Sequence, residues 1–69
     1  MNKVSIQTTR FVLRGTQLSL DNIEPVEKSG GISWDRKDDV LFRTAKHSLE
    51  KNSLVTEGML NKKEDYDNY

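Results

Sequence analysis

The strongest pattern in this chain is a helical repeat of apolar residues towards the C-terminus. When residues 41–60 are placed on a helical wheel at about 100° per residue, apolar side chains such as Leu41, Ala45 and Leu49 fall on one side. Charged side chains fall mostly on the opposite side. This is the pattern of an amphipathic helix that lies on a core, and it predicts one long helix over residues 36–60.

The start of this predicted helix carries suitable residues, but its middle carries a competing signal. Asp35 can cap the first turn, and Asp38 and Asp39 oppose the positive end of the helix dipole. Asn52 tolerates a left-handed backbone that ends a helix, and Ser53 can cap a second one. The pattern therefore leaves open a break near Asn52.

Three polar residues run down the middle of the apolar side: Ser48, Asn52 and Thr56. A polar seam packs poorly unless its groups find partners, so these side chains either sit at the edge of a thin core or face another chain. An asparagine at such a position can fix the register of a helix pair, which would make the protein a homodimer. They are candidate partner-binding residues.

The N-terminal half has the alternation of β-strands. Polar and apolar residues alternate over residues 3–7, and a change of parity further on predicts a bend or bulge at Thr8-Thr9. Residues 10–14 and 17–21 predict a hairpin around a two-residue loop, Gly15-Thr16, with glycine in first position.

The hairpin register also predicts the burial of its side chains. Four apolar residues share one buried face: Phe11, Leu13, Leu18 and Leu20. The same register sets Arg10 opposite Asp21, an oppositely charged pair. Val12 points to the other face, where it is either covered or exposed to a partner.

These elements together predict a small α+β fold. Residues 31–34 predict a third short strand, so that a three-stranded antiparallel β-meander packs against the long C-terminal helix. Residues 1–63 are expected to form a single domain, and residues 64–69 a flexible acidic tail.

The composition is poor in the residues of many catalytic and metal sites. The chain has 69 residues, no cysteine and one histidine, His47, so it cannot form a disulfide or a multi-histidine metal site. It contains no phosphate-binding loop, dinucleotide fingerprint or nucleophile elbow. Helix capping explains Asp35, Asp38 and Asp39 without a metal. We therefore expect no enzymatic activity, no metal and no cofactor.

The N-terminus is followed by polar residues rather than by the apolar run of a signal peptide, and no stretch is apolar enough to span a membrane. The expectation is a cytoplasmic protein without a membrane partner.

Charge is balanced in total but uneven along the chain. The 11 basic and 11 acidic residues cancel, yet residues 1–14 carry Lys3, Arg10 and Arg14 and no acid. A basic hairpin of this kind could contact phosphates, so nucleic-acid binding through these three residues is an alternative function. Overall neutrality argues against nucleic acid as the main partner.

The functional hypothesis is a non-enzymatic protein–protein interaction module that modulates a larger host protein. Small size, charged composition and the lack of catalytic motifs are typical of accessory or inhibitory proteins of phages and mobile elements. A minor structural subunit of a viral particle is a further alternative. The predicted partner-binding residues are Val12, Ser48, Asn52, Thr56, Tyr66 and Tyr69.

Overall fold

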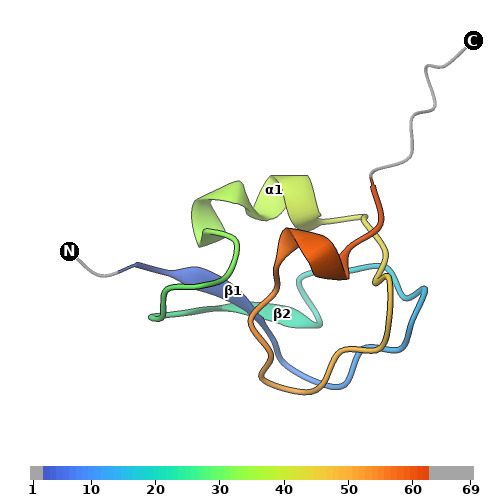
Figure 1. The fold of residues 1–69 in the computed structure, drawn as a ribbon. Coiled ribbons are helices and arrows are strands. Elements are labelled where there is room, and N and C mark those ends of the chain that lie inside the picture. The colour runs from blue at the N-terminus through green and yellow to red at the C-terminus, as the bar shows by residue number, and fades with distance from the viewer. Residues whose placement is uncertain (1–2, 63–69) are drawn as a thin grey trace, which may run out of the picture.

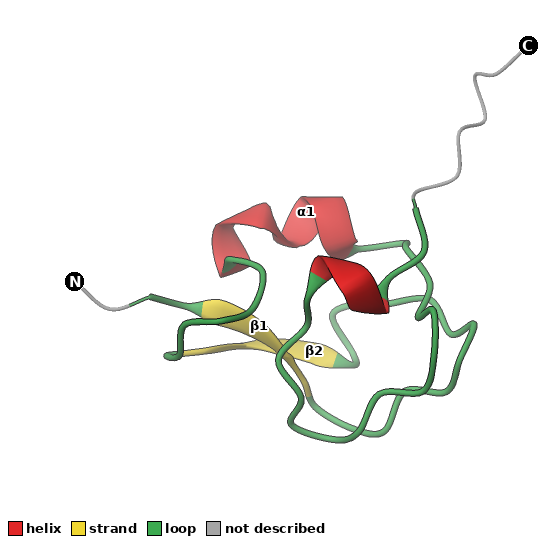
Figure 2. Ribbon diagram, in the orientation of Figure 1, coloured by secondary structure: helices red, strands yellow, loops and turns green. Residues whose placement is uncertain are grey.

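The computed structural model describes residues 3–62. Regular elements within this range are short: β1 (Ser5–Thr8), β2 (Ile23–Val26), the 3₁₀ helix η1 (Trp34–Arg36), α1 (Lys37–Val40) and the 3₁₀ helix η2 (Glu57–Met59). Long loops connect them and fold back over β1 (Figures 1 and 2). No helix in the described range is long and apolar enough to cross a membrane.

β1 is the centre of the fold because it bonds to other segments along both edges. One edge pairs antiparallel with β2, where Ile6 lies opposite Pro25. On the other edge, Ile6 donates its N–H to the carbonyl of Ile32 at 2.8 Å and accepts from the N–H of Val55 at 2.9 Å. Ile32 in turn donates to the carbonyl of Val55 at 2.8 Å, which closes a ring of three hydrogen bonds. Pro25 is tolerated because Ile6 needs no partner from β2.

Gly31 lies where these three segments cross. A Cβ atom there would stand 3.1 Å from the carbonyl oxygen of Val55 and 3.2 Å from the Cβ of Ser5. The backbones approach so closely that only glycine fits without a shift of the neighbouring chain.

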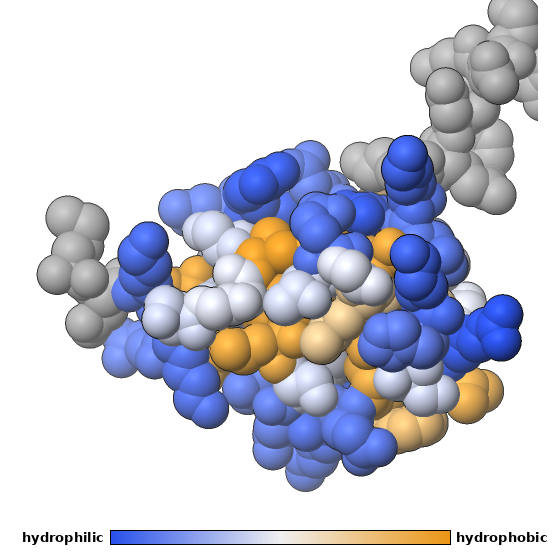
Figure 3. All heavy atoms as spheres, viewed as in Figure 1, coloured by the Kyte–Doolittle hydropathy of each residue, from blue (hydrophilic) through white to orange (hydrophobic). Residues whose placement is uncertain are grey.

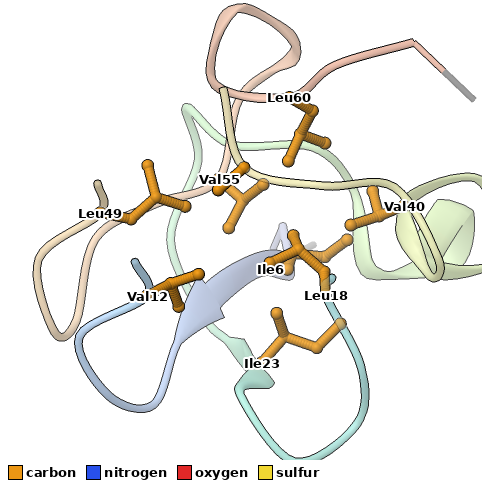
Figure 4. Close-up of a cluster of buried hydrophobic side chains, with 9 residues drawn as sticks. Ile6, Val12, Leu18, Ile23, Val40, Leu49, Val55 and Leu60 are labelled. Atoms are coloured by element: carbon orange, nitrogen blue, oxygen red, sulfur yellow. The ribbon is translucent and has the colours of Figure 1, made fainter. Parts of the chain in front are cut away.

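The hydrophobic core is built from single residues spaced four to six positions apart within each half of the chain. The loops reach the core with one side chain at a time and then turn away. Among residues 3–62, nine buried hydrophobic residues form this cluster (Figure 4): Ile6, Val12, Leu18, Ile23, Val40, Ala45, Leu49, Val55 and Leu60.

Buried polar side chains form hydrogen bonds to backbone groups that lie outside the short helices and strands. Thr8 is fully buried, and its hydroxyl donates to the carbonyl of Glu50 at 2.7 Å and accepts from the N–H of Ser53 at 2.9 Å. No buried side-chain nitrogen or oxygen in residues 3–62 lacks a hydrogen-bond partner. The Thr8 hydroxyl also supplies partners to backbone groups of Glu50 and Ser53, which lie outside any helix or strand, and so avoids the cost of leaving these groups unpaired.

The predicted long helix over residues 36–60 is wrong. α1 ends at Val40, and both Phe42 and Asn52 have left-handed backbones, with φ of 75° and 64°, which a right-handed helix excludes. The left-handed backbone considered at Asn52 is confirmed. The cap also differs from the prediction, because the side chain of Ser33 caps η1 by accepting from the N–H of Asp35.

The predicted meander is also wrong, because residues 10–14 and 17–21 do not pair with each other. They pair instead with residues 44–49, through bridges from Val12 to Leu49 and from Gln17 to Thr44. The turn between them is centred one residue earlier than predicted. Thr16 donates to the carbonyl of Leu13 at 2.9 Å, and Gly15, with φ of 87°, is the third residue of the turn.

This pairing inverts most of the predicted buried face. Val12 is buried, whereas Phe11, Leu13 and Leu20 are at least half exposed; of the four predicted residues, Leu18 alone is buried. Arg10 and Asp21 form no ion pair within residues 3–62. The chain bends at Thr9 and Arg10, so the bend predicted at Thr8-Thr9 is confirmed at Thr9.

Candidate protein-binding face

Two loop segments that are far apart in the sequence, residues 10–20 and 40–49, run side by side (Figure 1). Backbone hydrogen bonds join them along their length. These include two bonds of 2.8 Å between Val12 and Leu49, one of 3.0 Å from Ala45 to Thr16 and one of 2.8 Å from Leu18 to Arg43. Their inward side chains belong to the core, so the segments form a supported platform for the side chains that point outward.

Exposed hydrophobic side chains are concentrated on these two segments. Four large hydrophobic residues are exposed in residues 3–62, and all four belong to the two segments: Phe11 (50%), Leu13 (62%), Leu20 (63%) and Phe42 (70%). Phe11 and Leu13 point outward because Val12 between them points into the core. In the space-filling view, small apolar patches lie next to charged surface on the right-hand side of the molecule, where these two segments run in Figure 1 (Figure 3).

The same two segments contain five basic residues and no acidic residue: Arg10, Arg14, Arg43, Lys46 and His47. Arg43 is largely covered and paired with Glu57, whereas Arg10, Arg14 and Lys46 are exposed. We call the exposed set the basic–apolar face and define it by seven residues: Arg10, Phe11, Leu13, Arg14, Leu20, Phe42 and Lys46. Opposite charge elsewhere on the chain balances it, which is why total charge did not reveal it.

Phe42 holds a backbone conformation that its residue type disfavours. Leu41 has φ −58° and ψ 138°, Phe42 has φ 75°, and Arg43 donates to the carbonyl of Val40 at 3.1 Å. These values define a type II turn with Phe42 at the position that normally carries glycine or asparagine. A left-handed backbone costs a bulky residue about 1–2 kcal/mol. The ring gains little in return from the fold, since Phe42 is 70% exposed.

Contacts on both sides hold the Phe42 turn in place. Phe42 donates its N–H to the carbonyl of Leu18 at 3.0 Å, and its own carbonyl accepts from the side-chain amide of Gln17 at 3.2 Å. On the far side, the Arg43 guanidinium makes two hydrogen bonds to the Glu57 carboxylate, of 3.0 and 3.2 Å. These bonds and the charge of Arg43 hold the pKa of Glu57 below its usual value. The turn therefore presents Phe42 from a fixed position.

The residues predicted to bind a partner do not come together as one helical seam. Val12 is buried in the core. Ser48 and Asn52 are exposed and lie in loops, and Thr56 is half-buried just before η2. Tyr66 and Tyr69, with the rest of the predicted tail, lie outside the described residues.

Two of the three basic residues predicted for nucleic-acid binding lie on the basic–apolar face. Arg10 and Arg14 flank Phe11 and Leu13, whereas Lys3 lies before β1, at the opposite end of that strand. The sequence analysis did not identify Phe42 as a candidate functional residue. The local sequence does not indicate a left-handed backbone at Phe42, because such positions usually carry glycine or asparagine.

The remaining candidate sites are weaker. A pocket of about 460 Å³ lies beside the N-terminal end of β1, and Trp34 and the Gly30-Gly31 turn form part of its wall. The amine of Lys37 stands 5.4 Å from the centre of the Trp34 ring. No group of three potential metal ligands occurs in residues 3–62, and His47 is exposed with its Nδ1 3.1 Å from the Ser48 carbonyl.

The chain matches no protein-family model, and no curated protein matches it.

Proposed function

We propose that this protein is a non-enzymatic binding module that docks on a larger protein through the basic–apolar face, with Phe42 as the anchor. The single observation that carries the proposal is the strained, exposed position of Phe42. Glycine would suit that turn better, so folding does not account for the aromatic ring. Strained residues of this kind cluster at functional sites, and buried aromatic anchors dominate many protein interfaces.

The composition of the face supports a protein as the partner. Aromatic residues and arginine are enriched in protein interfaces, and the segments that carry the apolar residues of the face also carry the exposed Arg10, Arg14 and Lys46. A nucleic-acid site would use the same cations but would have little use for exposed leucines at positions 13 and 20. The matching partner surface is an apolar pocket with carboxylates at its rim, because complementary charge steers and orients docking.

This mode of action fits an accessory or inhibitory protein, which acts by covering part of a larger one. Such a role needs a rigid platform, and the backbone bonds between residues 10–20 and 40–49 supply it. It also needs an anchor held in one geometry, which the turn at Phe42 supplies.

Affinity capture with matched variants tests the proposal. The full chain serves as bait in a lysate of cells that express it, alongside Phe42→Gly, Phe42→Tyr and an off-face control, Lys28→Ala. We expect the wild type, Phe42→Tyr and Lys28→Ala to capture the same protein, and Phe42→Gly to lose it. Loss of an anchor of at least 2 kcal/mol should weaken the Kd of the purified pair by about 30-fold or more.

Capture by Phe42→Gly equal to that by the wild type would overturn the proposal. So would tight binding to duplex DNA that survives Phe42→Gly but is lost in the double variant R10E/R14E, because that result would assign the face to nucleic acid.

A further inference from the structure

The last described residues lie at the border of the basic–apolar face. Asn61 donates its backbone N–H to the Thr44 carbonyl at 2.9 Å and its side-chain amide to the Thr44 hydroxyl at 2.8 Å. The carbonyl of Asn61 accepts from Nε of Arg43 at 2.9 Å. Because Arg43 and Thr44 directly follow Phe42, the chain beyond Lys62 starts next to the Phe42 turn.

The sequence that follows is complementary to this face in charge and in side-chain type. After Lys62 and Lys63, the last six residues hold three acids, two aromatics and one asparagine: Glu64, Asp65, Tyr66, Asp67, Asn68 and Tyr69. The face offers the exposed cations Arg10, Arg14 and Lys46 together with exposed phenylalanine and leucine side chains. Tyrosine rings pack well on such side chains or over a guanidinium group, and carboxylates pair with the cations.

The length of the segment limits how far its side chains can reach from Asn61. Tyr66 is five residues beyond Asn61 and Tyr69 is eight residues beyond it. An extended chain spans at most about 3.3–3.6 Å per residue, so these side chains can lie as far as about 17 Å and about 27 Å from Asn61. Attachment by so short a link gives an effective concentration of the order of millimolar, and a weak intrinsic affinity is then enough for binding.

We propose that residues 64–69 bind the basic–apolar face of their own chain and compete there with the partner protein. The regulatory part of this inference rests on the proposed function, because competition requires a partner for the same face. A partner must displace the segment, so its apparent affinity is reduced by the fraction of chains in which the face is already occupied. Binding is therefore limited to partners whose acidic and aromatic groups bind the face more strongly than residues 64–69 do.

Nuclear magnetic resonance on the full ¹⁵N-labelled chain tests the contact without a partner. The triple variant E64Q/D65N/D67N and the double variant Y66S/Y69S remove the charge and the rings separately. N68S is the matched control in the same segment. We expect both test variants, and not N68S, to shift the amide signals of Phe11, Leu13 and Leu20, which are remote in sequence from the substitutions.

Two further backgrounds test whether the cations of the basic–apolar face cause these signal shifts. In an R10Q/R14Q background the triple variant should no longer shift these signals, whereas in a K28Q/K37Q background it should shift them as in the wild type. Raising the ionic strength to about 1 M, where the Debye length is about 3 Å, should reduce the effect of the triple variant.

Unchanged signals at Phe11, Leu13 and Leu20 in both test variants would overturn the inference. So would shifts that persist undiminished in the R10Q/R14Q background. Neither result concerns the proposed function, which fails separately if capture of the partner does not depend on Phe42.

Discussion

Replacing Phe42 by glycine should give a more stable protein than replacing it by alanine, which is the reverse of the usual order. Both variants remove the same aromatic ring, so the contacts of that ring cancel in the comparison. What differs is the backbone: at φ of 75°, alanine is strained and glycine is not.

The size of the difference follows from two opposing terms. A non-glycine residue in the left-handed region costs about 1–2 kcal/mol. The greater freedom of glycine in the unfolded chain costs about 0.4–1 kcal/mol. From the midpoints of the two ranges, we expect the free energy of unfolding of Phe42→Gly to exceed that of Phe42→Ala by about 0.8 kcal/mol, or about 3–6 °C in Tm for a domain of this size.

Urea and thermal unfolding, followed by circular dichroism, measure this difference. The control is the pair Lys46→Gly and Lys46→Ala, since Lys46 is exposed and does not have a positive φ. There alanine should be the more stable by about 0.5–1 kcal/mol. If alanine were the more stable residue at position 42 as well, Phe42 would not be strained, and the reason for assigning its ring to a partner would disappear.

Three further predictions concern the core, the ion pair and the chain crossing. Val12→Ala should lower the free energy of unfolding by about 1–3 kcal/mol, and Leu13→Ala by less than about 1 kcal/mol; equal losses in urea unfolding would contradict the observed orientation of the two side chains. Because Arg43 lowers the pKa of Glu57 in the folded state, this carboxylate stabilises the fold above its unfolded-state pKa, and that contribution is lost as the pH falls through the lower folded pKa. The urea midpoint of the wild type should therefore fall more steeply than that of Glu57→Gln between about pH 6 and pH 3, whereas parallel profiles would show that the pair adds nothing measurable. Gly31→Ala should cost about 1–3 kcal/mol because the added methyl group meets backbone, and an unchanged thermal midpoint would show that the crossing can open to admit it.

Features that depend on neighbouring residues were predictable. Asn52 has the left-handed backbone that its residue type permits, and Asp38 and Asp39 lie in the helical turn where acids were expected. Arg10 and Arg14 are exposed, in keeping with their charge. In each case the side chain acts on its own or an adjacent peptide group, so the information lies within a few residues.

The long helix failed for a reason that can be traced to particular residues. The buried residues of the second half, Ala45, Leu49, Val55 and Leu60, are four to six positions apart. That spacing is close enough to helical multiples to produce an apolar side on a wheel. A loop that reaches the core with one side chain at a time can have the same spacing of apolar residues. Periodicity alone therefore could not distinguish such a loop from a helix.

The candidate site depends almost wholly on long-range pairing. Leu13 and Val12 have similar hydrophobicity, and only the bond between Val12 and Leu49 decides which of the two enters the core. Phe42 is exposed because its turn is bonded to Leu18 in a segment more than 20 residues away. Residue chemistry thus set the left-handed backbone at Asn52 and the acids in the first turn of α1, since those interactions involve residues a few positions apart. Backbone hydrogen bonds between distant segments decided which apolar side chains were buried and which stayed exposed, and such bonds produce no periodic pattern in the sequence.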